Sequence, residues 1–201
     1  TSMTDNQTLA VYARDADRYA QRFAATRDLD GVVELEAFIA TVPNGGHVLD
    51  LGCGPGQWAA ALRDRGLSVD AMDASPEMAA VAARDYGVTV RIASFDDLDE
   101  TARYDGIWAS FSLLHTPRAA FPGHLRRIHR ALKPAGTFLI GMKLGAGEGR
   151  DDLGRFYTYY GEDELRAYLA DTGFTIFHTR RGRGKGLAGT DDEYAILIAH
   201  A

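Results

Sequence analysis

A glycine-rich stretch that follows a short apolar segment most constrains what this 201-residue chain can fold into. Residues 48–58 read Val-Leu-Asp-Leu-Gly-Cys-Gly-Pro-Gly-Gln-Trp, with glycine at the alternate positions 52, 54 and 56. Glycine adopts backbone angles that are closed to other residues, and it has no Cβ to block a neighbour. A strand that ends in such a turn lets a nucleoside-bearing ligand lie directly against the main chain. The stretch therefore predicts a ligand-binding turn at the end of a strand.

The bulk properties are those of an ordinary globular domain. Hydrophobic residues make up 46% of the chain and charged residues 25%, and the length fits one domain. Apolar runs are too short to span a membrane, and the first residues are too polar for a secretory signal. The single cysteine excludes an intramolecular disulfide, so we expect a cytoplasmic protein with no membrane partner. The net charge of −6 argues against a general nucleic-acid binder.

Strand-like and helix-like segments alternate along the chain. Apolar, β-rich segments predict strands at residues 47–51, 68–72, 88–92, 106–110, 137–142, 174–179 and 194–199. Helical spacing and helix-breaking residues predict helices at residues 8–23, 32–40, 57–65, 119–132 and 162–172, with a further helix opened by Ser75-Pro76. This alternation predicts an α/β fold with a doubly wound, mostly parallel sheet of seven strands. Because no helix separates the last two strands, we expect an antiparallel C-terminal hairpin at one edge.

Acidic and polar residues follow the first three strands, at the edge where such sheets bind ligands. Asp50 lies in the first strand, Asp73 ends the second, and Ser94-Phe95-Asp96 follows the third. A carboxylate at position 73 can accept hydrogen bonds from both hydroxyls of a ribose. The dinucleotide fingerprint Gly-x-Gly-x-x-Gly fails because Gln57 stands at its third glycine position, which argues against a nicotinamide site.

The glycine turn resembles the first motif of the class I S-adenosylmethionine-dependent methyltransferases. Segments similar to the family's later motifs follow in register, at residues 73–78, 104–110, 113–115 and 130–137. On these five elements the chain is identified as a member of the family, of the small bacterial single-domain type. The resemblance implies a Rossmann-like methyltransferase fold, with S-adenosyl-L-methionine as cofactor and S-adenosyl-L-homocysteine as product. It also implies one domain over residues 1–201, made of a helical cap (1–42), a cofactor-binding core (47–142), and a lid segment, last helix and hairpin (143–201).

The resemblance further implies that twelve residues hold the cofactor. Gly52, Cys53 and Gly54 would carry the backbone against the methionine part and the ribose. Asp73 would hold the ribose hydroxyls, and Asp96 would bind the adenine amino group. Asp50 would help to place the loop or the cofactor's amino group. The remaining six would flank the adenine, line the methionine end or cover the cofactor: Tyr19, Ala74, Met78, Ser94, Phe95 and Ser110. Many relatives carry an acid where Ser94 stands, so either Ser94 acts as a weaker partner or Asp96 does the whole task.

Three residues are candidate catalytic groups. His115 is expected either to bond to the backbone at the start of a helix or to face the substrate as a base or orienting group. Tyr157 and Tyr159 belong to an aromatic run that forms either a strand-like cover or the wall of an acceptor pocket. The surrounding segment, residues 145–161, is a candidate mobile lid. No His/Cys cluster has metal-ligand spacing, so we expect no metal.

The expected reaction is transfer of a methyl group to a small-molecule acceptor by in-line displacement. The chain has no large insertion with which to grip a macromolecule, so nucleic acid is a disfavoured partner. Two alternatives remain open. One is an RNA or protein methyltransferase that uses the basic, glycine-rich loop at residues 180–185, which is otherwise a solvated hairpin connection. The other is a non-catalytic regulatory module that binds S-adenosylmethionine.

Overall fold

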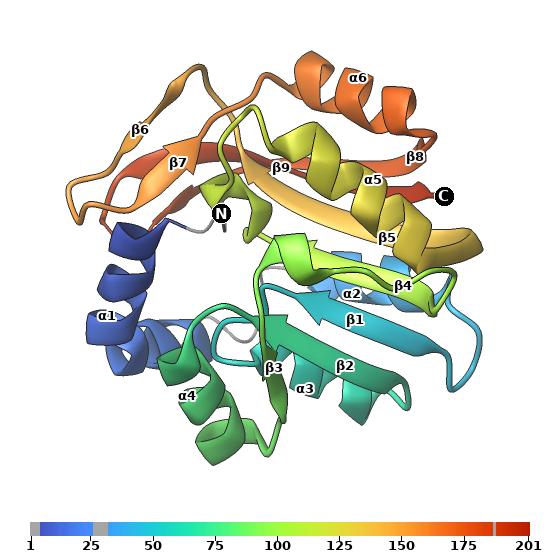
Figure 1. The fold of residues 1–201 in the computed structure, drawn as a ribbon, viewed down its shortest axis with the longest axis horizontal. Helices are drawn as coiled ribbons and strands as arrows, with labels where there is room; N and C mark the ends of the chain where they lie inside the picture. The colour runs from blue at the N-terminus through green and yellow to red at the C-terminus, as the bar shows by residue number, and fades with distance from the viewer. Residues whose placement is uncertain (1–4, 26–31, 187) are drawn as a thin grey trace.

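The computed structural model describes residues 5–25, 32–186 and 188–201. Helices cover both faces of a twisted central sheet (Figure 1). None of the described helices is long and apolar enough to cross a bilayer. The elements, in chain order, are α1 (Asn6–Ala25), α2 (Val32–Ile39), β1 (His47–Leu51), α3 (Gln57–Asp64), β2 (Ser68–Asp73), α4 (Pro76–Tyr86), β3 (Val90–Ile92), η1 (Phe95–Asp97), β4 (Tyr104–Ser110), η2 (Leu113–His115), α5 (Phe121–Ala131), β5 (Leu132–Lys143), β6 (Glu148–Arg150), β7 (Phe156–Thr158), α6 (Glu162–Thr172), β8 (Thr175–Lys185) and β9 (Asp191–His200).

Seven strands form one sheet in the order β3-β2-β1-β4-β5-β9-β8. The first five are parallel neighbours, and β9 runs antiparallel to both β5 and β8. This is the predicted α/β fold, a doubly wound, mostly parallel sheet with an antiparallel C-terminal hairpin, and the prediction is confirmed. The strand order reverses between β1 and β4, which is where sheets of this type bind ligands beyond their carboxyl ends.

The two faces of the sheet carry separate cores because side chains alternate along each strand. On β4, Ile107 and Ala109 belong to the core beneath α5 and α6, whereas Trp108 belongs to the core beneath α2 and α3. Phe38 of α2 meets the Trp108 ring edge-on at 5.3 Å. Fully burying a large side chain of this kind stabilises the fold by roughly 1.5–3 kcal/mol.

The basic segment at residues 180–185 is not a loop, and that expectation was wrong. These residues continue β8 and pair with β9 as far as the Lys185–Asp191 partners. Alternating arginine and glycine favoured a turn in the sequence, but one of the glycines serves packing instead. A Cβ on Gly182 would lie 2.3 Å from the Tyr194 ring, so glycine gives that ring room to cross the strand.

Residues 145–161 form a cover that includes a second, two-stranded sheet, β6 with β7. Arg155, Tyr157 and Tyr160 are buried in it. The cover is joined to α1, because the Phe156 N–H donates to Thr8 Oγ1 at 2.8 Å. Figure 1 shows β6 and β7 beside the N-terminal end of α1. The aromatic run is therefore strand-like over Phe156–Thr158.

Candidate functional site

The glycine turn begins where β1 ends, and the neighbouring strand holds its backbone. The N–H groups of Gly52 and Cys53 both donate to the Met72 carbonyl, at 2.7 and 3.0 Å. Gly52 has a φ of +72°, in the region that favours glycine. A Cβ at this position would also lie 2.3 Å from the Cβ of Ser112. Position 52 therefore requires glycine for its backbone conformation and for the close approach of the loop after β4.

Asp73 ends β2 with its carboxylate fixed beside the turn. One oxygen accepts the N–H of Gly54 at 2.8 Å and the other accepts the N–H of Ser75 at 2.9 Å. Burial raises the pKa of Asp73, while these backbone donors act in the opposite direction. The result is a rigid carboxylate with lone pairs left over for a ligand.

Asp50 on β1 is a second carboxyl group at the same edge of the sheet. Its side chain is buried, and among the described residues its Oδ2 has no hydrogen-bond partner. Burial raises the pKa of Asp50 to about 8. The N–H of Ala59 donates to the carboxylate and lowers the pKa, but its effect is smaller than that of burial. The group therefore keeps its proton at neutral pH until a cation comes close enough to stabilise the ionised form.

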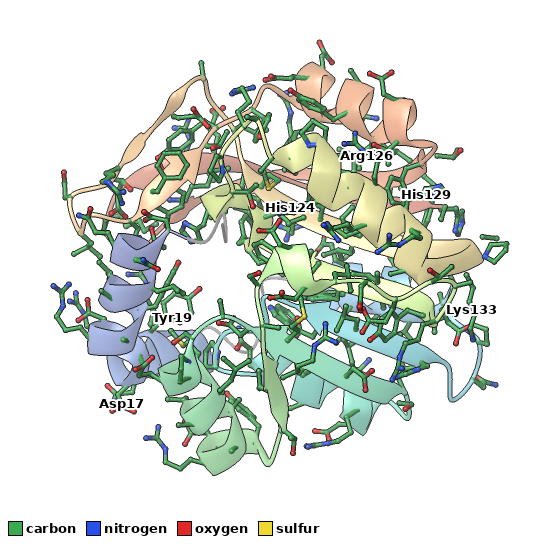
Figure 2. The ribbon with its side chains drawn as sticks, viewed as in Figure 1. Asp17, Tyr19, His124, Arg126, His129 and Lys133 are labelled. Atoms are coloured by element: carbon green, nitrogen blue, oxygen red, sulfur yellow. The ribbon has the colours of Figure 1, made fainter. Side chains whose placement is uncertain are left out.

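Ser94 and Asp96 follow β3, and both side chains already have partners. The Ser94 hydroxyl donates to Asp97 Oδ2 at 2.7 Å, at the start of η1. Asp96 Oδ1 lies 3.1 Å from Nε2 of His124, and the Phe95 ring meets His124 edge-on at 5.6 Å. His124 projects from α5 toward this edge of the sheet (Figure 2). One buried histidine thus contacts Phe95 and Asp96, two of the residues that were expected at the adenine.

A cavity of about 140 Å³ brings these groups together. Its wall contains all twelve residues expected at the cofactor: Tyr19, Asp50, Gly52, Cys53, Gly54, Asp73, Ala74, Met78, Ser94, Phe95, Asp96 and Ser110. The wall also contains residues that the sequence analysis did not single out, among them Thr8, Leu9, Tyr12, Trp58, Phe111, Ser112 and His124. Figure 2 shows Tyr19 and His124 entering from separate helices.

Two of the missed residues had a signal in the sequence. Tyr12 lies seven positions before Tyr19, which places both rings on one side of α1. His124 stands in the apolar stripe of α5 formed by Phe121, Leu125 and Ile128. A histidine within such a stripe needs a polar partner inside the fold.

A second cavity of about 740 Å³ adjoins the first, and its described wall shares six residues with it: Tyr12, Tyr19, Gln57, Trp58, Ser110 and Phe111. It lies on the face of the sheet covered by α2 and α3, where Trp108 and Leu139 are buried. Tyr157 is in its wall. Tyr159 is in the described wall of neither cavity and stacks on Tyr157 with ring centres 5.9 Å apart.

Tyr12 and His115 form a hydrogen-bonded chain at the boundary between the cavities. His115 Nδ1 lies 2.6 Å from the Phe156 carbonyl, so Nδ1 carries the proton and Nε2 accepts the Tyr12 hydroxyl at 2.7 Å. Arg155 donates to the Tyr12 oxygen at 3.2 Å. Burial lowers the pKa of His115 to about 4, which keeps the imidazole neutral at physiological pH. His115 ends η2 rather than starting a helix, and it both bonds to the backbone and faces a cavity.

No three His, Cys, Asp or Glu side chains in the described ranges are grouped as a metal site.

Residues 48–136 match the model of the methyltransferase domain family. Among solved structures, that of 1,6-didemethyltoxoflavin-N1-methyltransferase from Burkholderia thailandensis superposes on this chain with a TM-score of 0.71, and the two sequences are 28% identical. The similarity covers 95% of this chain and 87% of that one. These matches support the class I S-adenosylmethionine-dependent methyltransferase family for this chain. The resemblance seen in the sequence is confirmed.

Curated relatives match the chain over a shorter region. A ubiquinone biosynthesis O-methyltransferase of Xanthomonas oryzae pv. oryzae is 33% identical over 104 residues, which cover 48% of this chain and 42% of that one. A carboxy-S-adenosyl-L-methionine synthase of Geobacter metallireducens is 34% identical over 115 residues, which cover 52% and 47%. The chain thus spans less than half the length of the curated relatives it matches.

Proposed function

We propose that this chain is an S-adenosylmethionine-dependent methyltransferase that methylates a small-molecule acceptor and releases S-adenosylhomocysteine. The observation that carries the proposal is the meeting of two carboxyl groups, a glycine turn and a larger adjoining cavity at one edge of the sheet. Support comes from the methyltransferase of Burkholderia thailandensis, whose structure holds both 1,6-didemethyltoxoflavin and S-adenosylhomocysteine.

The residues around the smaller cavity fit the parts of the cofactor. Asp73 takes the ribose hydroxyls, because its fixed carboxylate retains free lone pairs beside the turn. Asp50 takes the ammonium group, because its unpartnered oxygen is buried there. We assign the adenine amino group to Asp96 rather than to Ser94, because a carboxylate beside His124 Nε2 has more acceptor sites for an amino group than a single hydroxyl has. The other expected residues line the remaining surface: Tyr19, Gly52, Cys53, Gly54, Ala74, Met78, Phe95 and Ser110.

When bound, the cofactor supplies a methyl group made electrophilic by its positively charged sulfur. The protein's own residues must orient the acceptor and receive its proton. Tyr12 lines both cavities, and its hydroxyl donates to His115 Nε2 at 2.7 Å, so we infer that a proton lost by the acceptor passes through Tyr12 to His115. General-base catalysis of this kind typically contributes 10²–10⁴-fold. We assign Tyr12 and His115 as catalytic, Tyr157 as an acceptor contact, and Tyr159 as a positioning residue that supports the Tyr157 ring.

A macromolecular acceptor gains little support from the basic strand. Within the described chain, Arg180 pairs with Glu34, Arg181 with Glu162, and Arg183 with Glu193. Arginines neutralised by the protein's own acids release fewer counterions from a phosphate backbone. A purely regulatory module is distinguished by turnover, because formation of S-adenosylhomocysteine in the presence of a small acceptor excludes it.

Calorimetry with S-adenosylhomocysteine tests the cofactor assignment. We expect Asp73→Ala to weaken binding at least tenfold, about 1.4 kcal/mol, because the ribose loses its carboxylate. Asp70→Ala is the matched control, since Asp70 lies on the same strand, accepts the Tyr104 hydroxyl at 3.0 Å and is outside the wall of the smaller cavity. Equal affinity in the wild type and Asp73→Ala would contradict the proposal.

A further inference from the structure

The larger cavity has the size and the lining of a site for an organic ring system. Its volume of about 740 Å³ lies within the ~300–1,000 Å³ typical of small-molecule sites. The chain has two tryptophans, Trp58 and Trp108, and both are in the wall. Leu139 and Ile196 extend the apolar floor from β5 and β9.

Aromatic rings face this cavity from several directions. Trp58 and Trp108 have ring centres 5.0 Å apart with their planes tilted by 44°. Phe111 and Tyr194 meet edge-on at 5.4 Å, and Tyr157 adds a fifth ring. Aromatic pairs at 4.5–7 Å are worth roughly 0.5–1.5 kcal/mol beyond simple burial. A planar aromatic ligand can form such pairs with several rings of the wall, whereas a saturated ring is stabilised only by the burial of its apolar surface.

Two cations of the wall already have anionic partners. Lys143 Nζ lies 2.6 Å from Asp192, and Arg180 donates to the buried Glu34 at 3.1 Å. Neither of these two cations therefore requires a ligand with a fixed negative charge. Lys143 Nζ also lies 4.2 Å from the centre of the Tyr157 ring.

The proton route at the boundary of the cavities favours an acidic hydroxyl. Tyr12 donates to His115, whose imidazole is desolvated and therefore a weak base with a lowered pKa. A weak base accepts a proton readily only from a group that already ionises easily. A hydroxyl on an aromatic ring has a pKa near ~10, as in tyrosine, far below that of an aliphatic alcohol.

We propose that the larger cavity is the acceptor site and that it takes a planar aromatic molecule with a hydroxyl on its ring. This inference rests on the proposed function and specifies its substrate class. The ring lies among Trp58, Trp108 and Tyr194, with the hydroxyl toward Tyr12. The hydroxyl oxygen forms the bond to the methyl carbon while the carbon–sulfur electron pair stays with sulfur. The hydroxyl proton passes to the Tyr12 oxygen as the Tyr12 proton passes to His115.

A matched pair of probes tests the ring requirement. Protein saturated with S-adenosylhomocysteine is titrated by calorimetry with 2-naphthol and with its fully saturated counterpart, decahydro-2-naphthol. We expect 2-naphthol to bind at least tenfold more tightly. Bound 2-naphthol should also shorten the tryptophan emission lifetime, which absorption by free ligand does not change. In Trp58→Phe the shortening should persist, because Trp108 then reports from this cavity alone.

A variant that fills the cavity tests the location. Ala61 of α3 lines the larger cavity and is absent from the wall of the smaller one. We expect Ala61→Phe to weaken 2-naphthol binding at least tenfold and to leave the affinity for S-adenosylhomocysteine within twofold. Ala80→Phe, on the exposed side of α4, is the matched control and should change neither affinity.

The outcomes separate this inference from the proposed function. If S-adenosylhomocysteine itself does not bind, the proposed function fails. If it binds while the saturated alcohol equals 2-naphthol in affinity, or while 2-naphthol shows no binding up to millimolar concentration, the inference alone is overturned. Unchanged 2-naphthol binding in Ala61→Phe would overturn the location.

Discussion

The smaller and the larger cavity share a wall but are assembled in different ways. The smaller one is built mainly from the ends of four consecutive parallel strands and the turns that follow them. The larger one joins α2 and α3 to the C-terminal hairpin, as in the ion pair between Glu34 and Arg180, which lie 146 positions apart. A site at consecutive strand ends depends on short local motifs, whereas a site between distant segments requires the whole sheet to be in place.

The largest expected effect tests the long-range assembly of the larger cavity. Glu34 is 1% exposed and Arg180 is 29% exposed, so Glu34→Ala leaves a partly buried cation without its partner. We expect the free energy of unfolding to fall by about 3 kcal/mol, as for other broken buried pairs. Urea denaturation measures it. The control is Glu36→Ala on the same helix, whose pair with Arg65 is exposed and should be worth less than about 1 kcal/mol. Similar losses in both variants would remove the special role of the buried pair.

The next effect tests the local assembly of the smaller cavity. Gly52→Ala should lower the affinity for S-adenosylhomocysteine about 100-fold, or about 2.7 kcal/mol, because the new Cβ collides with Ser112 and displaces the turn. Calorimetry measures the change. Gly45→Ala is the control, since Gly45 has a similar φ of +69° with nothing within 4 Å of the added Cβ. It should cost stability but not affinity, and equal affinity losses would show that strain alone matters.

The boundary between the cavities should respond to pH. The pKa of His115 is about 4 in the folded protein and about 6.5 in the unfolded chain. Between these values the unfolded chain binds a proton that the folded protein refuses, so stability falls as the pH drops below about 6.5. From pH 7 to pH 5 this group contributes a loss of about 2 kcal/mol. His115→Gln should remove that part of the pH dependence in urea denaturation, whereas His129→Gln should retain it. Parallel pH profiles for His115→Gln and the wild type would refute the assignment.

The smallest effect concerns the outer edge of the hairpin. Arg183 and Glu193 pair on β8 and β9 with both side chains more than half exposed. We expect Arg183→Gln to change the free energy of unfolding by less than about 0.5 kcal/mol, because exposed ion pairs are weak. The affinity for S-adenosylhomocysteine should not change. A marked loss of methylation confined to RNA or protein acceptors would instead restore the macromolecular alternative.

The sequence predicted the part of the site whose signals are local. The glycine turn and a carboxyl group at the end of β2 are visible in short stretches of sequence, and the structure has both in the wall of one cavity. The contact between Tyr12 and His115 joins positions 103 apart and depends on how α1 is laid over the sheet. No periodicity within either segment specifies that distance.

The C-terminal hairpin shows the same limit in its secondary structure. Its existence followed from the lack of a helix between two apolar segments, yet its length did not. In the sequence, Gly182 was interpreted as a loop residue. Its role is to make room for the Tyr194 ring of the partner strand, and that role is visible only once the strands are paired. The strand predicted from local composition therefore ended at residue 179, whereas β8 continues to Lys185.

One helix, α1, closes both cavities, because Tyr12 and Tyr19 stand in both walls. It is tethered to the aromatic cover by the ion pair of Asp5 with Arg150 and by the bond from Phe156 to Thr8. Under the proposed function, the methyl donor and the acceptor would therefore both contact α1. We expect whichever binds first to fix the position of α1 for the other, so that substrates bind and products leave in a compulsory order rather than a random one.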